Sequence, residues 1–92
     1  MRIEQALRIH GPKKVHLRGF LLYCDGEALL LCTELLESLP PQCGGPSLVV
    51  EGLNIDTLSD IIRSDDCAWS ARPVELHGIV DGGILQVPGE ED

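Results

Sequence analysis

The sequence predicts an all-β protein, a five-stranded antiparallel Greek-key barrel accompanied by two short helices. Apolar and polar residues alternate along the first and fourth predicted strands, which is the pattern of a strand with one buried face. Asp25-Gly26 and Asp81-Gly82-Gly83 follow such segments and are typical of hairpin turns. Residues 15–21 and 74–80 both contain V-x-L-x-G followed by two apolar residues. Two strands with the same glycine suggest two similar bends, which a small sheet needs in order to curl closed.

The N-terminal part is predicted to contain a lead-in helix and the first strand. Residues 2–10 carry apolar side chains at i, i+3 and i+4 spacing, and Gly11-Pro12 ends this pattern. Alternation with a period of two begins at Val15 and predicts a strand over residues 15–24. One face of this strand is polar before Gly19 and apolar after it, so we expect a bend at this glycine.

The middle of the chain is predicted to alternate strands with short pieces of other structure. Residues 28–33 return from the hairpin turn as the second strand, and Thr33 is placed to cap a helical turn that ends at Pro40. The composition of residues 40–46, PPQCGGP, predicts a stiff loop without regular structure. Residues 48–53 form the third strand.

A second helix is predicted over residues 56–63, between the third and fourth strands. Asp56 is its cap, and Leu58, Ile61 and Ile62 form an apolar face that we expect to cover one open end of the barrel. The remaining segments are a polar connection, two strands and an acidic tail, at residues 64–70, 74–80, 84–87 and 89–92.

The length and composition predict one domain, residues 1–88. The chain has 92 residues, of which 43% are hydrophobic. A chain of this size buries only about 60–65% of the surface that it exposes when unfolded, which argues against two separate cores. No apolar run is long enough to span a membrane, and the first residues do not form a secretory signal. We therefore expect a cytoplasmic monomer or weak dimer, exported only if the sequence is a trimmed piece of a longer chain.

Two stretches of the sequence resemble known proteins. Residues 3–7, IEQAL, followed by VHLRGFL at residues 15–21, look like the beginning of many OB domains, with a short helix before a V-x-V-x-G-x-[LIV] strand. Residues 31–45, LCTELLESLPPQCGG, resemble a stretch in small bacterial proteins of uncharacterised function. The residues quoted for the two resemblances number 27 of the 92 in the chain. The resemblance implies an OB-like barrel and assigns no activity.

The charge distribution is uneven and bears on nucleic-acid binding. Seven Lys and Arg stand against fifteen Asp and Glu, so the net charge of −8 disfavours a polyanionic partner. Five of the basic residues nevertheless lie within the first eighteen positions. An alternative function is therefore a nucleic-acid-binding OB domain, with these candidate residues: Arg8, Lys13, Lys14, Arg18 and Phe20.

Four cysteines are present and none belongs to a C-x-x-C pair. Cys32 ends a predicted strand and Cys43 lies in the loop that returns toward the next one. We expect their Cα atoms to lie within about 7 Å, which makes them the disulfide candidate. Cys24 and Cys67 are interpreted as buried free thiols. Thiol- or metal-dependent activity at Cys32 and Cys43 is a second alternative function.

The sequence contains no nucleophile elbow, phosphate loop or dinucleotide fingerprint, so we predict no catalytic residue, cofactor or metal ligand. The favoured function is a non-enzymatic binding module for an unidentified protein or small ligand. Its candidate contact residues come from the stiff loop and the single tryptophan: Pro41, Gln42, Gly44, Gly45 and Trp69. Two roles remain open for Trp69, which either anchors a ligand or packs over the barrel end.

His16 and His77 occupy similar positions in the two V-x-L-x-G segments. If these strands are neighbours, both side chains face outward. Such a pair suits a weak metal site or a pH-sensitive patch, although two simply exposed histidines are the more ordinary interpretation.

Overall fold

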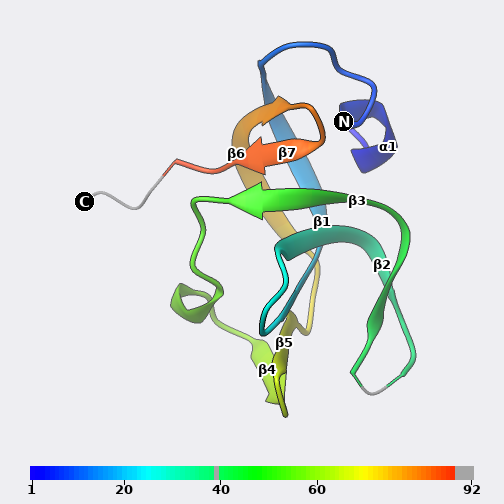
Figure 1. Cartoon of the computed structure of the whole chain (residues 1–92), viewed down its shortest axis with the longest axis vertical. Helices are drawn as coiled ribbons and strands as arrows, with labels where there is room; N and C mark the ends of the chain where they lie inside the picture. Colours follow the sequence, from blue (N-terminus) through cyan, green and yellow to red (C-terminus); the bar gives the residue numbers. More distant parts are fainter. Residues whose placement is uncertain (39, 89–92) are drawn as a thin grey trace.

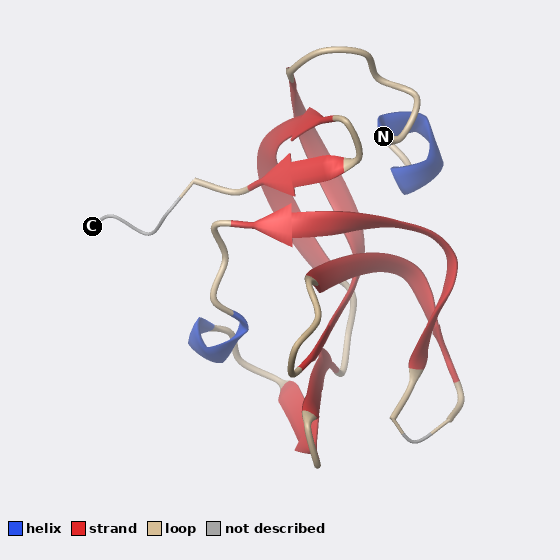
Figure 2. Ribbon diagram, in the orientation of Figure 1, coloured by secondary structure: helices blue, strands red, loops and turns tan. Residues whose placement is uncertain are grey.

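The computed structural model describes residues 1–38 and 40–88. Over these residues the chain is mostly β-structure, which confirms the predicted all-β class (Figures 1 and 2). The elements in chain order are α1 (Ile3–Ala6), β1 (Lys13–Cys24), β2 (Leu29–Leu36), β3 (Gln42–Glu51), the 3-10 turn η1 (Ile55–Thr57), β4 (Ile61–Ser64), β5 (Cys67–Ser70), β6 (Val74–Asp81) and β7 (Ile84–Gln86). None of the helices among them is long and apolar enough to cross a membrane.

The strands belong to one sheet in the order β2-β3-β7-β6-β1-β5-β4, and β2 also pairs with β1. Five of them therefore pair in a closed circuit, β1-β2-β3-β7-β6 and back to β1, in which only β3 and β7 are parallel. The β4–β5 hairpin lies outside this circuit and is joined to it where β5 pairs with the end of β1 (Figure 1). The predicted count of five strands is wrong, because the described residues form seven. The twelve-residue β1 is long enough to pair first with β6 and then with β5 along the same edge.

The two V-x-L-x-G segments pair with each other. Leu17 lies opposite Leu76, and each motif valine lies opposite the other motif's glycine. A Cβ atom added at Gly19 would lie 2.6 Å from the carbonyl oxygen of Cys32, and 3.1 Å from Cδ1 of Ile3. Glycine is therefore required where β1 leaves β6 and passes close beneath β2.

Several predicted element bounds are wrong. The lead-in helix is limited to α1, and residues 33–36 continue strand β2 instead of forming a helical turn. Residues 42–46 of the predicted loop form the first half of β3. In place of a helix over residues 56–63, the chain forms η1 and then β4, and β5 replaces the predicted polar connection. Asp60 and Asp65 have positive φ values of 60° and 52°, so each breaks a right-handed helix on one side of β4.

Two hydrophobic clusters lie on opposite faces of the sheet. The larger fills the inside of the closed circuit with side chains such as Leu17, Leu21, Leu31, Leu48 and Leu85. The smaller lies on the outward face around Leu22, Cys32 and Trp69, and all four cysteines belong to it or pack against it. The two disulfides lie within this small cluster and add stability by restricting the unfolded chain. The predicted acidic tail, residues 89–92, lies outside the described residues.

Candidate functional site: an apolar groove between two hairpins

An unbroken row of apolar side chains crosses the outward face of the sheet. Each member is the direct register partner of the next, and the row runs Val49, Leu30, Leu22, Trp69 and Ile62, on strands β3, β2, β1, β5 and β4. Directly opposed residues of neighbouring strands have Cβ atoms about 4.5–5.5 Å apart, so these side chains contact one another. An outward face is normally polar, and a continuous apolar row on it indicates a surface that is covered by something.

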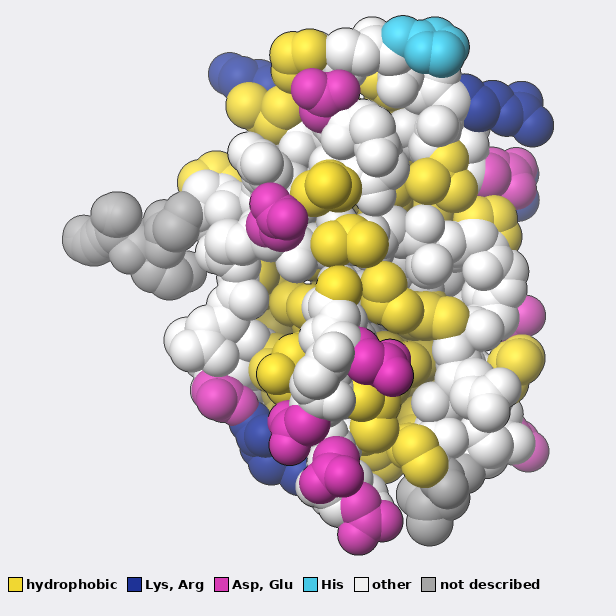
Figure 3. Space-filling view, viewed as in Figure 1, with side chains coloured by type: hydrophobic (Ala, Val, Ile, Leu, Met, Phe, Trp, Pro, Cys, Tyr) yellow, Lys and Arg dark blue, Asp and Glu magenta, His cyan; other side chains and the backbone are white. Residues whose placement is uncertain are grey.

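Part of this face is covered by the far end of the β2–β3 hairpin. Leu35 and Cys43 pack against the outward cluster, and Pro41 is buried. Beside Pro41 this cover ends and leaves a groove of about 270 Å³. Leu36 and Pro41 line it on the β2–β3 side, and Trp69 and Ile62 line it on the β4–β5 side. Phe20 from β1 is also part of the lining. Leu36 and Ile62 are 46% and 44% exposed. Figure 3 shows hydrophobic side chains gathered down the middle of the molecule, with Asp and Glu side chains along its lower edge.

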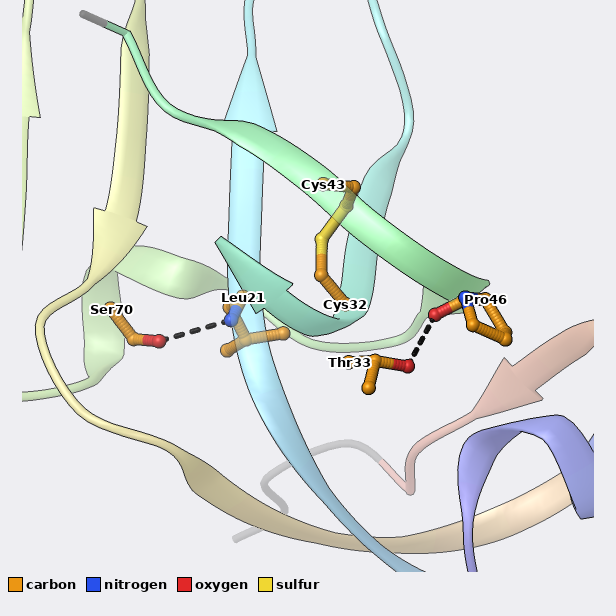
Figure 4. The surroundings of a disulfide bond; sticks show 6 residues. All are labelled: Leu21, Cys32, Thr33, Cys43, Pro46 and Ser70. Atoms are coloured by element: carbon orange, nitrogen blue, oxygen red, sulfur yellow. Dashed lines mark hydrogen bonds between the residues drawn. A yellow bond between two sulfur atoms is a disulfide. The ribbon is translucent and has the colours of Figure 1, made fainter. Parts of the chain in front are cut away.

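Each hairpin that borders the groove is held by one disulfide. Cys32–Cys43 joins β2 to β3 with a Cα–Cα distance of 5.3 Å, which confirms that the two residues are close in space (Figure 4). Cys24–Cys67 joins β1 to β5 with a Cα–Cα distance of 4.0 Å. The interpretation of Cys24 and Cys67 as free thiols is wrong because these two residues are register partners across β1 and β5. In this form none of the four sulfur atoms is a thiolate, so the proposed thiol activity at Cys32 and Cys43 would first need reduction.

Two hydrogen bonds complete the backbone around the groove (Figure 4). The backbone N–H of Leu21 donates to Oγ of the buried Ser70 at 3.0 Å. This amide lies where β1 has left β6 and has not yet met β5, so the serine hydroxyl stands in for a strand partner. On the hairpin, Thr33 Oγ1 donates to the carbonyl of Pro46 at 2.7 Å, across a bulge between Cys32 and Glu34. The bulge lets β3 include a proline without losing a ladder bond.

The structure brings together some of the residues predicted as ligand contacts and separates others. Pro41 and Trp69 line the groove. Trp69 is only 9% exposed, so it belongs to the outward cluster and does not project as an anchor. Gln42 and Gly45 are exposed on β3 outside the groove lining, and Gly44 is buried beside Leu36 and Glu34.

Sequence reasoning missed the two exposed large hydrophobic residues of the groove, Leu36 and Ile62. A usable signal was the doublet at positions 61 and 62. Two successive isoleucines in a strand point to opposite faces, so one of them must face outward.

The candidate nucleic-acid residues are exposed except for Phe20, which is partly buried. Lys14, Arg18 and Phe20 lie on the outward face of β1, whereas Lys13 begins the strand and Arg8 precedes it. Of these three residues on β1, Phe20 lies nearest the groove and is part of its lining. Arg18 has an acidic register partner, Glu75, which reduces the positive field along the strand.

A larger hollow of about 490 Å³ lies at the other side of the β4–β5 hairpin, between Tyr23, Leu53 and Ile55. Asp56 and Arg63 both line it and form an ion pair with each other, and Asp25 also lines it. The described residues contain no group of three or more His, Cys, Asp or Glu side chains placed to hold a metal ion.

Comparison of the chain with protein-family models, with curated proteins and with solved structures finds no match.

Proposed function

We propose that this chain is a non-enzymatic binding module that holds an extended apolar segment of a partner protein in the groove between its two hairpins. The observation that carries this proposal is that each hairpin bordering the groove has its own disulfide. Fixed walls lose little conformational entropy when a ligand binds, which favours affinity.

The edge of the sheet supports an extended partner. Strand β4 is the last strand in the sheet order, so within the described residues its outer edge has no strand partner. A peptide lying along β4 would form main-chain hydrogen bonds there, while its side chains on one face enter the groove beside Ile62 and Trp69.

The negative charge around the groove favours a bound segment that carries basic residues. Glu37 lines the groove, Asp60 directly precedes β4, and the whole chain carries a net charge of −8. We therefore propose a segment that alternates large apolar residues with Lys or Arg. Complementary charge of this kind raises the association rate and excludes acidic competitors.

The fold and the compartment are part of the same proposal. The closed strand circuit and the resemblance of residues 3–7, 15–21 and 31–45 support an OB-like Greek-key barrel with the β4–β5 hairpin inserted before its fourth strand. The two disulfides favour an oxidising compartment over the cytoplasmic location that the sequence suggested, since cytosolic proteins rarely retain disulfides.

Selection from a library of random displayed peptides on the immobilised oxidised protein tests the proposal. We expect enriched peptides with alternating apolar and basic residues, and we expect the Leu36→Ser/Ile62→Ser variant to lose their binding. Ile79→Ser is the matched control, because Ile79 is 42% exposed on β6 away from the groove. Enriched peptides that bind the groove variant as well as the parent protein would refute the proposal.

One observation favours the second candidate function, nucleic-acid binding. Lys14, Arg18 and Phe20 lie along one outward face of β1 and would present two cations and one aromatic ring to a single strand. Binding of a labelled single-stranded oligonucleotide at about 50 mM salt, weakened by Arg18→Ser and by added salt, would support this function. Absence of binding at that salt concentration would eliminate it.

A further inference from the structure

His16 and His77 stack on each other on the outward face of the sheet, at the end of β1 away from the groove. They are direct register partners across β1 and β6. Their ring centroids are 4.1 Å apart and the ring planes differ by 19°. The pairing of the two V-x-L-x-G segments places them together, since each histidine directly follows or precedes a core leucine of its motif.

A carboxylate fixes one of the two rings. Oε1 of Glu75 lies 3.0 Å from Nε2 of His16, on a diagonal between the two strands. Glu75 and His16 are both more than half exposed, so water reaches the pair. Lys14 and Arg18 flank His16 on the same face of β1, and Ile79 follows His77 on β6.

We propose that His16 and His77 bind one divalent transition-metal ion of the Zn²⁺ and Ni²⁺ class, with Glu75 as the positioning residue. Imidazole nitrogen suits these borderline ions. Directly opposed residues of neighbouring strands have Cβ atoms about 4.5–5.5 Å apart, so both exposed side chains reach one ion above the sheet. An imidazole nitrogen binds an ion in the plane of its ring, so the two stacked rings rotate out of the stack until a nitrogen of each lies about 2.0–2.1 Å from the ion, and water molecules fill the other coordination positions.

The role of Glu75 follows from its bond to Nε2 of His16. A carboxylate that accepts a hydrogen bond from one imidazole nitrogen leaves the other nitrogen, Nδ1, for the metal and increases its basicity. The same carboxylate offsets the charges of Lys14 and Arg18, which otherwise repel a divalent cation. The site is independent of the groove, so the two proposals stand or fall separately.

Calorimetric titration of the untagged, oxidised protein with Zn²⁺ alone and with Ni²⁺ alone tests the inference. We expect one saturable site per chain, abolished by His16→Asn and by His77→Asn. His10→Asn is the matched control, because His10 is an exposed histidine outside the pair, and we expect it to bind like the parent protein. Far-ultraviolet circular dichroism verifies that each variant keeps its fold.

Two further measurements sharpen the test. In NMR spectra, Zn²⁺ should shift the ring signals of both His16 and His77 while leaving those of His10 in place. Glu75→Gln should weaken binding by about tenfold, the usual effect of losing an outer-shell carboxylate. Full binding in either His16→Asn or His77→Asn, or the absence of saturable binding in the parent protein, would overturn the site. Unchanged affinity in Glu75→Gln would overturn the role given to Glu75.

Discussion

Leu22 and Trp69 face each other as register partners of β1 and β5, at the centre of the apolar row on the outward side of the sheet. Leu22 also faces Leu30 on its other side, so β1 connects the two hairpins that border the groove. The stability of the groove therefore depends on one tryptophan, which we expect to act as part of the fold.

Trp69→Ala should lower the free energy of unfolding by about 3–5 kcal/mol, the usual cost of deleting a large buried aromatic side chain. Ile62→Ala is the matched control, since Ile62 is the neighbour of Trp69 on β4 and is 44% exposed. Urea unfolding followed by circular dichroism measures both changes. Equal losses in the two variants would show that Trp69 is not part of a packed cluster.

Removing the disulfides should destabilise the protein to different extents. Cys32 and Cys43 are 11 residues apart, and Cys24 and Cys67 are 43 apart. Chain-entropy arguments then give losses of about 3 kcal/mol for Cys32→Ser/Cys43→Ser and about 4 kcal/mol for Cys24→Ser/Cys67→Ser. Urea midpoints of the two double variants without reductant measure this order, and intact mass with and without reductant verifies the bonds. Both values would be contradicted if reductant left the urea midpoint of the parent protein unchanged while the intact mass showed that both disulfides were reduced.

Gly19→Ala should destabilise the protein by about 1–3 kcal/mol, because a Cβ atom there displaces the Cys32 carbonyl or the Ile3 side chain. Gly11→Ala serves as the comparison, since Gly11 has a φ of 82° and a Cβ atom added to it would meet nothing within 4 Å. Its expected cost is only the left-handed conformation of alanine, about 1–2 kcal/mol. Thermal melting ranks the two variants, and restoration of the Gly19→Ala loss by Ile3→Val would assign part of it to crowding against Ile3.

Ser70→Ala should remove one buried hydrogen bond and lower the stability of the protein. The variant leaves the backbone N–H of Leu21 without its acceptor, at an expected cost of about 1–3 kcal/mol for an unsatisfied buried donor. Amide hydrogen exchange locates the effect. Exchange at Leu21 should accelerate more than exchange at Leu17, which lies in the β1–β6 ladder. Uniform acceleration at both residues would contradict this local role.

The sequence predicts those parts of the fold in which pattern and local chemistry agree. The V-x-L-x-G segments are both strands, and the bend expected at Gly19 coincides with the approach of Cys32. Cys32 and Cys43 are neighbours because a hairpin joins them over a short stretch of chain. These features depend on residues close in sequence or on a repeated motif.

The sequence does not reveal the β4–β5 hairpin, for a physical reason. Leu58, Ile61 and Ile62 have the spacing of a helical face, and three residues fit more than one period. The decision is made by Asp60 and Asp65 in left-handed conformations and by the pairing of Trp69 with Leu22 on β1, which is a tertiary effect. The groove was missed for the same reason, since one of its two walls belongs to this hairpin.

The parallel pairing of β3 with β7 has a kinetic consequence. Val49 pairs with Ile84, and His16 pairs with His77. The circuit of strands therefore closes only after these distant residues have met. Contacts between such distant residues slow folding, because the long intervening chain must be confined first. During synthesis β2 and β3 are made before β6 and β7, so the β2–β3 hairpin is free to form before the circuit can close. We therefore expect this hairpin to be the earliest folded part, and the ring of strands to shut only once residues 84–86 are free to dock.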